Sequence, residues 1–509
     1  MENENYAIEC KGLTKTFGSV VANDHIDLKV RRGEILALLG ENGSGKTTLM
    51  NMLSGIYHPD CGEIFMDGRP VNINSPYDAR QLKIGMIHQH FKLVDVMSAM
   101  DNIALGTMEK HKSISALKKE ITELSSKYGM EIDPDRKIYS MSVSEKQTVE
   151  IMKVLYQGAS VLILDEPTAV LTPQETERLF NILRKMKEYG AAVIIITHKL
   201  NEVLAISDRV TILRKGCSID TVDTKGTDEK KLTELMVGRP VELSIKRAEC
   251  KDQKTLLEVY HLTAEAEDGS VALDDVSFNL RAGEILGVAG VAGSGQKELC
   301  ETLAGLHPIK KGAVLYKEED LIGKKPQEII NLGISMSFVP EDRLGMGLVS
   351  EMGMTGNMLL KNYSKPEGVF IDRKPARKMA EALIKKLDIV TPGTETPVRL
   401  LSGGNVQKVL LGREIEASPN VLITAYPVRG LDINSSYTVY DLLNKEKEKG
   451  VAVLYIGEDL DVLIALCDRI MVLCHGRVMG IADASRVTKK EIGLMMTGTE
   501  GPKEELENA

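Results

Sequence analysis

The clearest chemistry in this sequence lies in a glycine-rich loop at residues 40–48, between an apolar run and a helical pattern. In the order Gly-x4-Gly-Lys-Thr, the glycines let backbone N–H groups approach phosphate oxygens, and the start of the next helix adds a favourable dipole. Lys46 is suited to the β and γ phosphates of a nucleotide, and Thr47 to Mg²⁺. The predicted ATP-binding residues of this loop are Gly40, Glu41, Asn42, Gly43, Ser44, Gly45, Lys46, Thr47 and Thr48.

Two carboxylates follow the apolar run at residues 161–164. Asp165, at the end of the predicted strand, can reach the Mg²⁺ shell, and Glu166 can polarise an attacking water as a general base. A solvated acidic turn is the alternative, but a phosphate-binding loop in the same chain favours hydrolysis of a nucleotide. The cofactors predicted from these residues are ATP and Mg²⁺.

Three further side chains have two interpretations each. His198 follows the apolar run at residues 193–197, where it can sense the γ-phosphate or serve a structural role. Gln89 follows the run at residues 84–87 and can reach Mg²⁺ or the attacking water. Phe17, one of only seven phenylalanines, can stack on adenine or belong to the core.

The chain contains one module twice. Residues 34–36 and 284–286 both have the sequence Glu-Ile-Leu, and residues 290–297 repeat the glycines of the loop at residues 40–47. A repeat of this length indicates two similar domains rather than a solenoid of short units. The later matches are Gln147 with Gln407, Pro167 with Pro427, and Asp208 and Arg209 with Asp468 and Arg469.

We therefore predict two α/β domains, at residues 1–243 and 256–500, joined by a short polar linker at residues 244–255 and followed by a frayed tail at residues 501–509. In each, short apolar runs alternate with helical patterns, which indicates a mainly parallel sheet flanked by helices. The expected buried strands include residues 35–39 and 161–164. The expected helices carry Leu49, Met52, Leu53 and Ile56 in one case and Leu117, Ile121 and Leu124 in another.

The composition narrows the class of protein. Apolar residues make up 43% of the 509 residues and charged residues 27%, as in a globular protein, and the net charge of −9 does not favour nucleic acid. No apolar run reaches the length of a membrane helix, and the acidic start of the chain does not resemble a signal peptide. The seven cysteines include no Cys-x-x-Cys pair, so we expect reduced thiols and no metal site built from them.

A motif in the second copy resembles the signature sequence of ABC ATPases. It comprises Leu401, Ser402, Gly403, Gly404, Asn405, Val406 and Gln407. Together with the phosphate-binding loop and the residues discussed above, the resemblance covers essentially the whole chain. It implies two tandem P-loop ABC ATPase domains, each with a RecA-like core, a β-subdomain and a helical subdomain. It also implies that Ser402 and the two glycines offer hydroxyl and backbone donors to the ATP of the other domain.

The tandem arrangement is similar to the fused ATPases of bacterial sugar and nucleoside importers. Residues 339–343, 401–405 and 429–432 carry this resemblance, and residues 87–94 and 169–175 favour the nucleoside, or basic membrane protein-type, branch. The transported solute is expected to be a purine nucleoside, with a simple sugar such as ribose or galactose second and a vitamin such as riboflavin third.

ABC domains pair head to tail, so the resemblance implies two composite sites, of which only the first is complete. Site one joins the signature residues Ser402, Gly403, Gly404, Asn405 and Gln407 to Lys46, Thr47, Gln89, Asp165, Glu166 and His198, with Gln89 as a further Mg²⁺ ligand. Site two has Gln296 and Lys297 in its loop, Ala425 and Tyr426 for the carboxylates, and Glu341, Glu458 and Ala266 for Gln89, His198 and Phe17. The signature facing site two has Val143, Ser144 and Glu145 instead of glycines and asparagine. We therefore expect no useful hydrolysis there.

The resemblance also implies partners. Two integral-membrane permease subunits would contact residues 89–105 and a helical subdomain near residues 107–140, and an extracytoplasmic solute-binding lipoprotein would deliver solute. The chain would lie at the cytoplasmic face of the bacterial cell membrane as a peripheral protein. A rival from another class is a soluble tandem ABC protein acting on ribosomes or DNA, which usually keeps two competent sites and a long basic interdomain segment.

Overall fold

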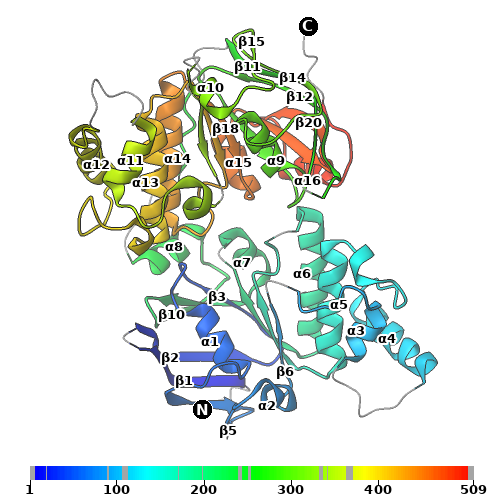
Figure 1. Cartoon of the computed structure of the whole chain (residues 1–509). Coiled ribbons are helices and arrows are strands. Elements are labelled where there is room, and N and C mark those ends of the chain that lie inside the picture. The colour runs from blue at the N-terminus through cyan, green and yellow to red at the C-terminus, as the bar shows by residue number, and fades with distance from the viewer. Residues whose placement is uncertain are drawn as a thin grey trace. The chain divides into compact units, whose positions relative to one another are not determined.

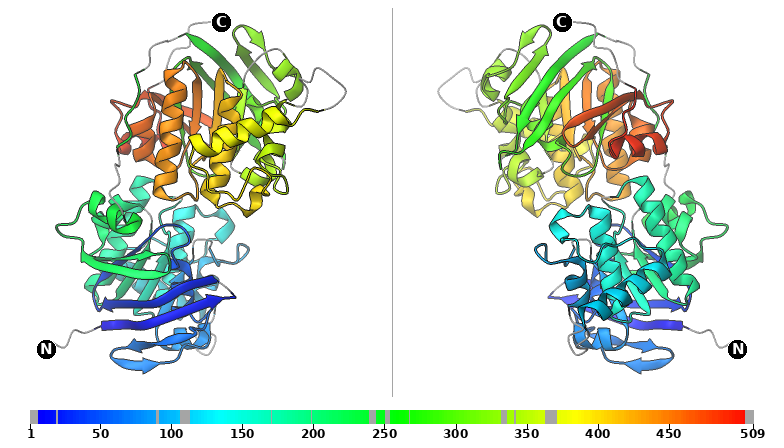
Figure 2. Two further views of the ribbon diagram at one scale, coloured as in Figure 1. Left: turned by 90° about the vertical axis from the view of Figure 1, so that its left-hand side faces the viewer. Right: turned by 90° about the vertical axis from the view of Figure 1, so that its right-hand side faces the viewer.

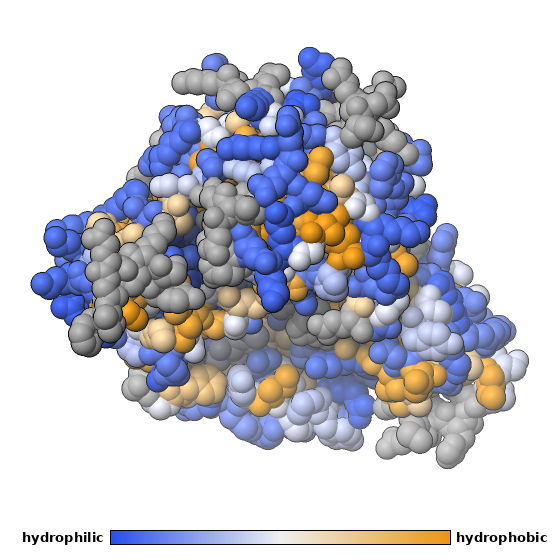
Figure 3. Space-filling model, turned by 45° about the horizontal axis from the view of Figure 1, so that its top comes forward, coloured by the Kyte–Doolittle hydropathy of each residue, from blue (hydrophilic) through white to orange (hydrophobic). Residues whose placement is uncertain are grey.

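The computed structural model describes residues 6–18, 20–88, 91–105, 113–169, 171–197, 199–238, 244–249, 254–266, 268–331, 336–340, 342–362 and 371–502. The chain divides into two compact units, Met1–Glu242 and Leu243–Ala509, each with its own sheets and cores (Figures 1 and 2). On the face in Figure 3, hydrophilic residues predominate and apolar residues form separate small patches. No helix within the described ranges is long and apolar enough to cross a membrane.

The larger sheet of unit 1 has six strands. They are β3 (Ile35–Leu39), β6 (Ile84–Ile87), β7 (Val161–Asp165), β8 (Ala192–Ile196), β9 (Arg209–Arg214) and β10 (Cys217–Asp223), in the order β10-β9-β3-β8-β7-β6. All pairings are parallel except that of β10 with β9. Every residue of β3 and β8 is buried, and this burial on both faces explains their continuous apolar sequences.

Unit 1 adds a small antiparallel sheet and several helices. The sheet has the order β2-β1-β4-β5, with β1 at Tyr6–Phe17, β2 at Val20–Arg31, β4 at Cys61–Met66 and β5 at Arg69–Val71. The helices are α1 (Lys46–Leu53), α2 (Pro76–Gln81), α3 (Ala99–Ala104), α4 (Ile114–Tyr128), α5 (Val143–Tyr156), α6 (Pro173–Glu188), α7 (Leu200–Ile206) and α8 (Glu229–Val237). Figure 1 shows α3, α4 and α5 on a different side of unit 1 from β1 and β2.

The six-stranded sheet separates two hydrophobic cores. Val161 and Ile163 of β7 pack in a core with the small sheet and α1, whereas Leu162 and Leu164 pack in a core with α4, α5 and α6. Alternate residues of one strand therefore anchor different layers, as the two-residue period of a strand requires. This arrangement fixes the strand ends, where polar side chains can gather.

Unit 2 repeats this plan. Its larger sheet is β16-β17-β18-β13-β19-β20, and its small sheet is β12-β11-β14-β15. The strands are β11 (Thr255–Glu265), β12 (Val271–Arg281), β13 (Ile285–Ala289), β14 (Lys311–Tyr316), β15 (Glu319–Asp320), β16 (Met336–Val339), β17 (Val421–Ala425), β18 (Ala452–Ile456), β19 (Arg469–Cys474) and β20 (Arg477–Asp483). The helices are α9 (Gln296–Leu303), α10 (Pro326–Asn331), α11 (Met354–Asn362), α12 (Lys374–Lys386), α13 (Gly403–Glu416), α14 (Ile433–Glu448), α15 (Leu460–Leu466) and α16 (Lys489–Met496).

Most of the elements expected from sequence are confirmed, and two details are wrong. Ile56 does not belong to the helix with Leu49, because α1 ends at Leu53 and Gly55 turns the chain with a φ of 75°. Ile56 is consequently 48% exposed. The tail does not fray from Gly501: this residue donates its N–H to Met479 O at 2.8 Å, and Ile481 N donates to Pro502 O at 2.9 Å.

A buried ion pair recurs at the same place in both units. Arg209 Nη1 lies 3.1 Å from Glu34 Oε1, and Arg469 Nε lies 2.5 Å from Glu284 Oε1. The aspartate before each arginine accepts the first N–H of the central strand, from Ile35 in unit 1 and from Ile285 in unit 2, both at 2.9 Å. The conserved repeat residues therefore align the central strand with its neighbour rather than contribute chemistry.

The segment that sequence analysis assigns to the linker packs on unit 2 over residues 244–249. Arg247 donates to the carbonyls of Ile464 and Ala465 at the end of α15. Lys447, whose side chain is fully buried, donates to Ala248 O and pairs with Asp468 Oδ1 at 2.7 Å. The corresponding Lys187 of unit 1 also pairs with an aspartate, but its side chain is 35% exposed.

We predict that Asp468→Asn destabilises unit 2 by about 3 kcal/mol, because it leaves the buried ammonium of Lys447 without a countercharge. The matched control, Asp208→Asn, should cost at most about 1 kcal/mol, since water reaches Lys187. Urea unfolding of the full chain, with hydrogen exchange of β13 and β3 to assign the loss to a unit, measures both. Equal losses of stability in the two variants would show that the burial of Lys447 under residues 244–249 has no energetic consequence.

Candidate functional site

The phosphate-binding loop of unit 1 connects β3 to α1. Its glycines are required by close backbone contacts: a Cβ on Gly40 would lie 2.4 Å from Leu213 O, and one on Gly45, whose φ is 95°, would lie 2.5 Å from Ala22 O. Gly45 is the N-cap residue of α1, so the first N–H groups of the helix face the interior of the loop. The loop is therefore shaped to surround an anion.

Lys46 is only 8% exposed and lies inside this loop. Its Nζ donates to Gly40 O at 2.7 Å and to Glu41 O at 2.9 Å. Burial lowers the pKa of the Lys46 ammonium, while the nearby charges of Glu166 and Asp165 act in the opposite direction. Lys46 and the two carboxylates are thus close enough for their charges to interact.

The two carboxylates lie at the carboxyl end of β7. Asp165 is its last residue, and Glu166 adopts a left-handed φ of 46° while its N–H donates to Ile196 O of β8 at 2.9 Å. Burial raises the pKa of the Asp165 carboxyl, and the charge of Glu166 adds to the shift. A non-glycine residue in this backbone region is strained, and such strain is concentrated at functional sites.

The residues at this edge suit a divalent cation. The carboxylate of Asp165 makes no hydrogen bond to another described residue, and Thr47, at the start of α1, is exposed. Ser44 Oγ is buried without a hydrogen-bond partner among the described residues. Carboxylate and hydroxyl oxygens are the ligands that Mg²⁺ prefers, so Thr47 and Asp165 fit this ion. Gln89 and His198 lie outside the described residues.

An aromatic pair lies on the small sheet side of unit 1. The Phe17 ring is 44% exposed and meets the Tyr57 ring edge to face, with centroids 5.2 Å apart. Of the two interpretations of Phe17, membership of the core is therefore wrong. Tyr57 was missed from sequence, although its position just after α1 and its counterpart His307 in the repeat could have identified it.

Unit 2 keeps the loop but changes its chemistry. Gln296 takes the place of Lys46, is buried, and donates from Nε2 to Val291 O at 3.1 Å. Lys297 does not replace the lost charge inside the loop, because its side chain is 64% exposed and its Nζ lies 3.9 Å from Glu301 on the next turn of α9. The loop therefore closes on a neutral amide.

The carboxylate positions of unit 2 are equally altered on an unchanged frame. Tyr426 has a φ of 49°, and its N–H donates to Ile456 O at 2.9 Å, as Glu166 does in unit 1. Burial and the charge of Glu458 raise the pKa of the Tyr426 phenol. Arg429 stacks on this ring and has its Nε 3.7 Å from Glu458. The turn survives without a general base.

The two signature segments begin helices with the same cap. Ser402 caps α13, and its Oγ accepts from Asn405 Nδ2 at 2.9 Å. A Cβ on Gly403 would have no neighbour closer than Arg343 Nη1 at 3.6 Å, so the fold itself leaves room at this glycine. Gln407 is fully buried, which places its side chain in the interior and not beside Ser402.

The signature of unit 1 has Glu145 where the signature of unit 2 has Asn405. Ser142 caps α5, and Glu145 Oε2 accepts the N–H of Ser142 at 2.7 Å in a capping box. Arg136 pairs with the same carboxylate, and Val143 is exposed where α13 has Gly403. The backbone N–H of Ser142 is therefore already bound within unit 1, and a carboxylate lies beside this signature.

Comparisons with known proteins agree with this geometry. The ABC transporter family model matches residues 23–169 and 273–427, one match in each unit. The chain is 41% identical over 504 residues to the nucleoside import ATP-binding protein NupA of Lactococcus lactis, covering 98% of this chain and 99% of the relative. It is 41% identical to the guanosine import ATP-binding protein NupO of Bacillus subtilis (97% and 98% covered). It is 39% identical to the ribose import ATP-binding protein RbsA 1 of Rubrobacter xylanophilus (97% and 98% covered).

The matches span nearly the full length of these relatives, and both units carry the phosphate-binding loop and signature positions in order. The chain therefore belongs to the ABC transporter family, as an ATP-binding protein with two cassettes in tandem.

Proposed function

We propose that this protein hydrolyses ATP to power the import of a nucleoside through a membrane ABC transporter, and that it does so at one competent site. The observation that supports one site is the complementarity of the two units. Unit 1 has Lys46 in its loop and both carboxylates, but Glu145 is hydrogen-bonded to Ser142 in its signature. Unit 2 has glycines in its signature, but the neutral Gln296 takes the place of the lysine in its loop. Each intact half lacks its partner within its own unit.

Head-to-tail pairing of the cassettes would join these intact halves in site one. Thr47, Asp165 and Gln89 would hold Mg²⁺, which neutralises charge on the β and γ phosphates when bound. Glu166 is positioned to take a proton from the attacking water. Ser402 Oγ and the backbone N–H groups of Gly403 and Gly404 would donate to the γ-phosphate. His198 would contact the same phosphate, and Phe17 with Tyr57 would stack on adenine.

The same pairing leaves site two without catalysis. Tyr426 offers no base, Gln296 offers no charge, and the signature that would face this site presents Glu145 to the phosphates. Loss of a general base alone typically costs about 10²–10⁴ in rate. ATP turnover is therefore assigned to site one.

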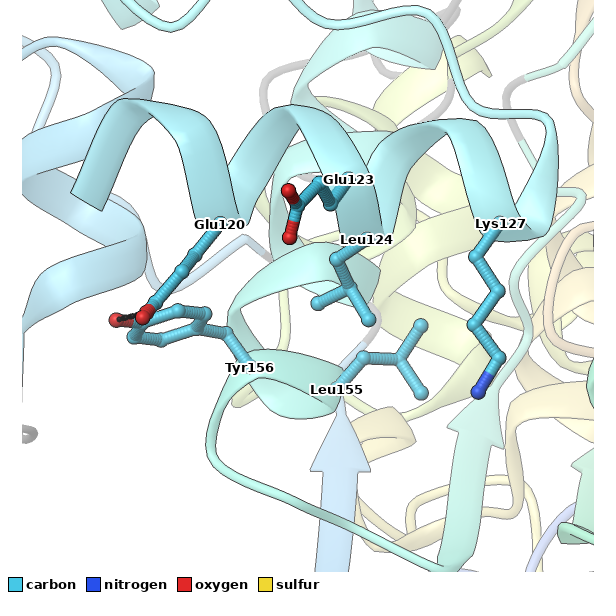
Figure 4. Close-up of a pocket in the computed structure, with 6 residues that line it drawn as sticks. All are labelled: Glu120, Glu123, Leu124, Lys127, Leu155 and Tyr156. Atoms are coloured by element: carbon cyan, nitrogen blue, oxygen red, sulfur yellow. Dashed lines mark hydrogen bonds between the residues drawn. The ribbon is translucent and has the colours of Figure 1, made fainter. Parts of the chain in front are cut away.

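The proposed partners are two membrane permeases and an extracytoplasmic solute-binding protein, with this chain at the cytoplasmic membrane face. Within the described part of unit 1, Val96 and Tyr139 are exposed apolar side chains near the helices expected to meet the permeases. Helices α4 and α5 form an open groove of about 340 Å³ (Figure 4), lined by Glu120, Glu123, Leu124, Lys127, Leu155 and Tyr156.

Guanosine is our first choice of solute, because two of the relatives above are named for nucleoside and guanosine import. A sugar such as ribose is the alternative, from the relative that is 39% identical. We do not propose action on ribosomes or DNA, because the three relatives are all named as import proteins.

Glu166→Gln should abolish ATP turnover while ATP stays bound, because the amide cannot accept the proton of the attacking water. Tyr426→Phe is the matched control at the same turn of unit 2, and its turnover should stay within about twofold of wild type, since a buried phenol is no base at neutral pH. Phosphate release from the purified chain measures both variants. Retained turnover in Glu166→Gln, or a large loss in Tyr426→Phe, contradicts the one-site proposal.

Asn405→Glu should rebuild in α13 the capping box that closes α5, placing a carboxylate beside Ser402. We expect ATP turnover to fall by about 10²-fold, the effect of losing donors to the transferred phosphate. Glu145→Asn in unit 1 is the reciprocal control and should leave turnover nearly unchanged, because that signature faces site two. Comparable losses in the two variants would mean that both signatures serve hydrolysis.

In cells that express this protein together with the permeases encoded by adjacent genes, uptake of labelled guanosine should depend on Glu166. The comparison is wild type against Glu166→Gln, with labelled ribose as the second solute. If only the uptake of ribose depends on Glu166, the protein powers a sugar importer and guanosine is the wrong solute. Uptake of neither solute through Glu166 would argue against the importer itself.

A further inference from the structure

An arginine lies beside the open signature of unit 2. Arg343 begins a π-helical turn, Arg343–Gly347, whose N-cap residue is Asp342, a short distance along the chain from the end of β16 at Val339. Its Nη2 donates to Arg429 O, and its Nη1 lies 3.6 Å from where a Cβ on Gly403 would stand. The guanidinium therefore lies between the turn after Tyr426 and the exposed signature glycine.

The charge of Arg343 has no countercharge in the described part of the chain. A guanidinium has five N–H donors and stays protonated, and among the described residues the hydrogen bond to Arg429 O uses one of them. Two carboxylates near this surface have partners of their own: Asp342 accepts the N–H of Gly345 at 2.8 Å, and Asp432 accepts from Ser435 N at 2.9 Å and Ser435 Oγ at 2.7 Å at the start of α14. Arg343 thus has donors left for a group that approaches Gly403.

The signature of unit 1 provides the contrast. There Arg136 is paired with Glu145, the residue that also caps Ser142. A cation beside that signature is thereby neutralised by its own unit. The signature of unit 2 has the neutral Asn405 where that of unit 1 has Glu145. Arg343 therefore places a positive charge beside Gly403 that no carboxylate of this signature neutralises.

We propose that Arg343 donates to the γ-phosphate of the ATP that the signature of unit 2 contacts, so that it distinguishes ATP from ADP. This inference rests on the proposed composite site one. The fork of the guanidinium suits it to hold Arg429 O with one amino group and a phosphate oxygen with the other. Lysine would keep the charge but lose this double contact.

The test measures ATP and ADP affinities of the purified full chain in the Glu166→Gln background, where bound ATP is not consumed. Arg343→Gln should weaken ATP binding roughly 10- to 100-fold, the effect of losing a hydrogen bond from a charged group, and leave ADP binding unchanged. Arg343→Lys should give an intermediate loss, and decides the matter if Arg343→Gln does not fold. Arg136→Gln, the matched change at the other signature, should leave both affinities unchanged.

Equal losses of ATP and ADP affinity in Arg343→Gln, or no loss, would overturn the role of Arg343 and leave only its contact with Arg429. Gly403→Val separates this failure from that of the composite site, since its side chain would block the phosphate. If Gly403→Val abolishes the preference for ATP while Arg343→Gln does not, only the arginine is wrong. If Gly403→Val has no effect, the composite site and the role of Arg343 both fail.

Discussion

The constraint on which both units depend is that their central parallel sheets are buried on both faces. Strands such as β3, β8, β13 and β18 carry apolar or uncharged side chains throughout, so charged groups can be placed only where the strands end. In unit 1, the loop after β3 and the turn after β7 meet at one edge. Lys46, Asp165 and Glu166 come together there although they are far apart in sequence.

The loop and the turn at the strand ends keep their backbone structure in unit 2, where the catalytic side chains are replaced, because backbone groups form their contacts. The left-handed turn and its N–H donation to the neighbouring strand are the same for Glu166 and Tyr426. The loop glycines also meet the same kind of carbonyl, Ala22 O in unit 1 and Ala272 O in unit 2. Side chains at these places can therefore change without loss of the fold, which explains how unit 2 retains its architecture without a catalytic carboxylate.

The sequence predicted what depends on local pattern and missed what depends on tertiary contact. Apolar runs located β3 and β7, and loop spacing located Lys46. The exposure of Phe17 beside Tyr57, the packing of residues 244–249 against α15 and the burial of Gln407 each require knowledge of a distant element. The sequence shows that Glu145 stands where the other signature has Asn405, but its capping of Ser142 is visible only in the structure. Gln89 and His198 remain predictions.

The degenerate halves remain stable because their extra acids are paired within their own units. Glu145 is held by Arg136, and Glu458 lies near Arg429, so neither carboxylate is an isolated charge. The same pairing neutralises the positive charges that would attract a phosphate, since each arginine already has a carboxylate beside it. In the intact halves, the hydrogen bonds of the Lys46 and Arg343 side chains to described residues go to backbone carbonyls, those of Gly40 and Glu41 for Lys46 and that of Arg429 for Arg343. A polyphosphate can replace or join such neutral acceptors far more readily than it can displace a carboxylate, and this difference supports the proposal that ATP is hydrolysed at site one.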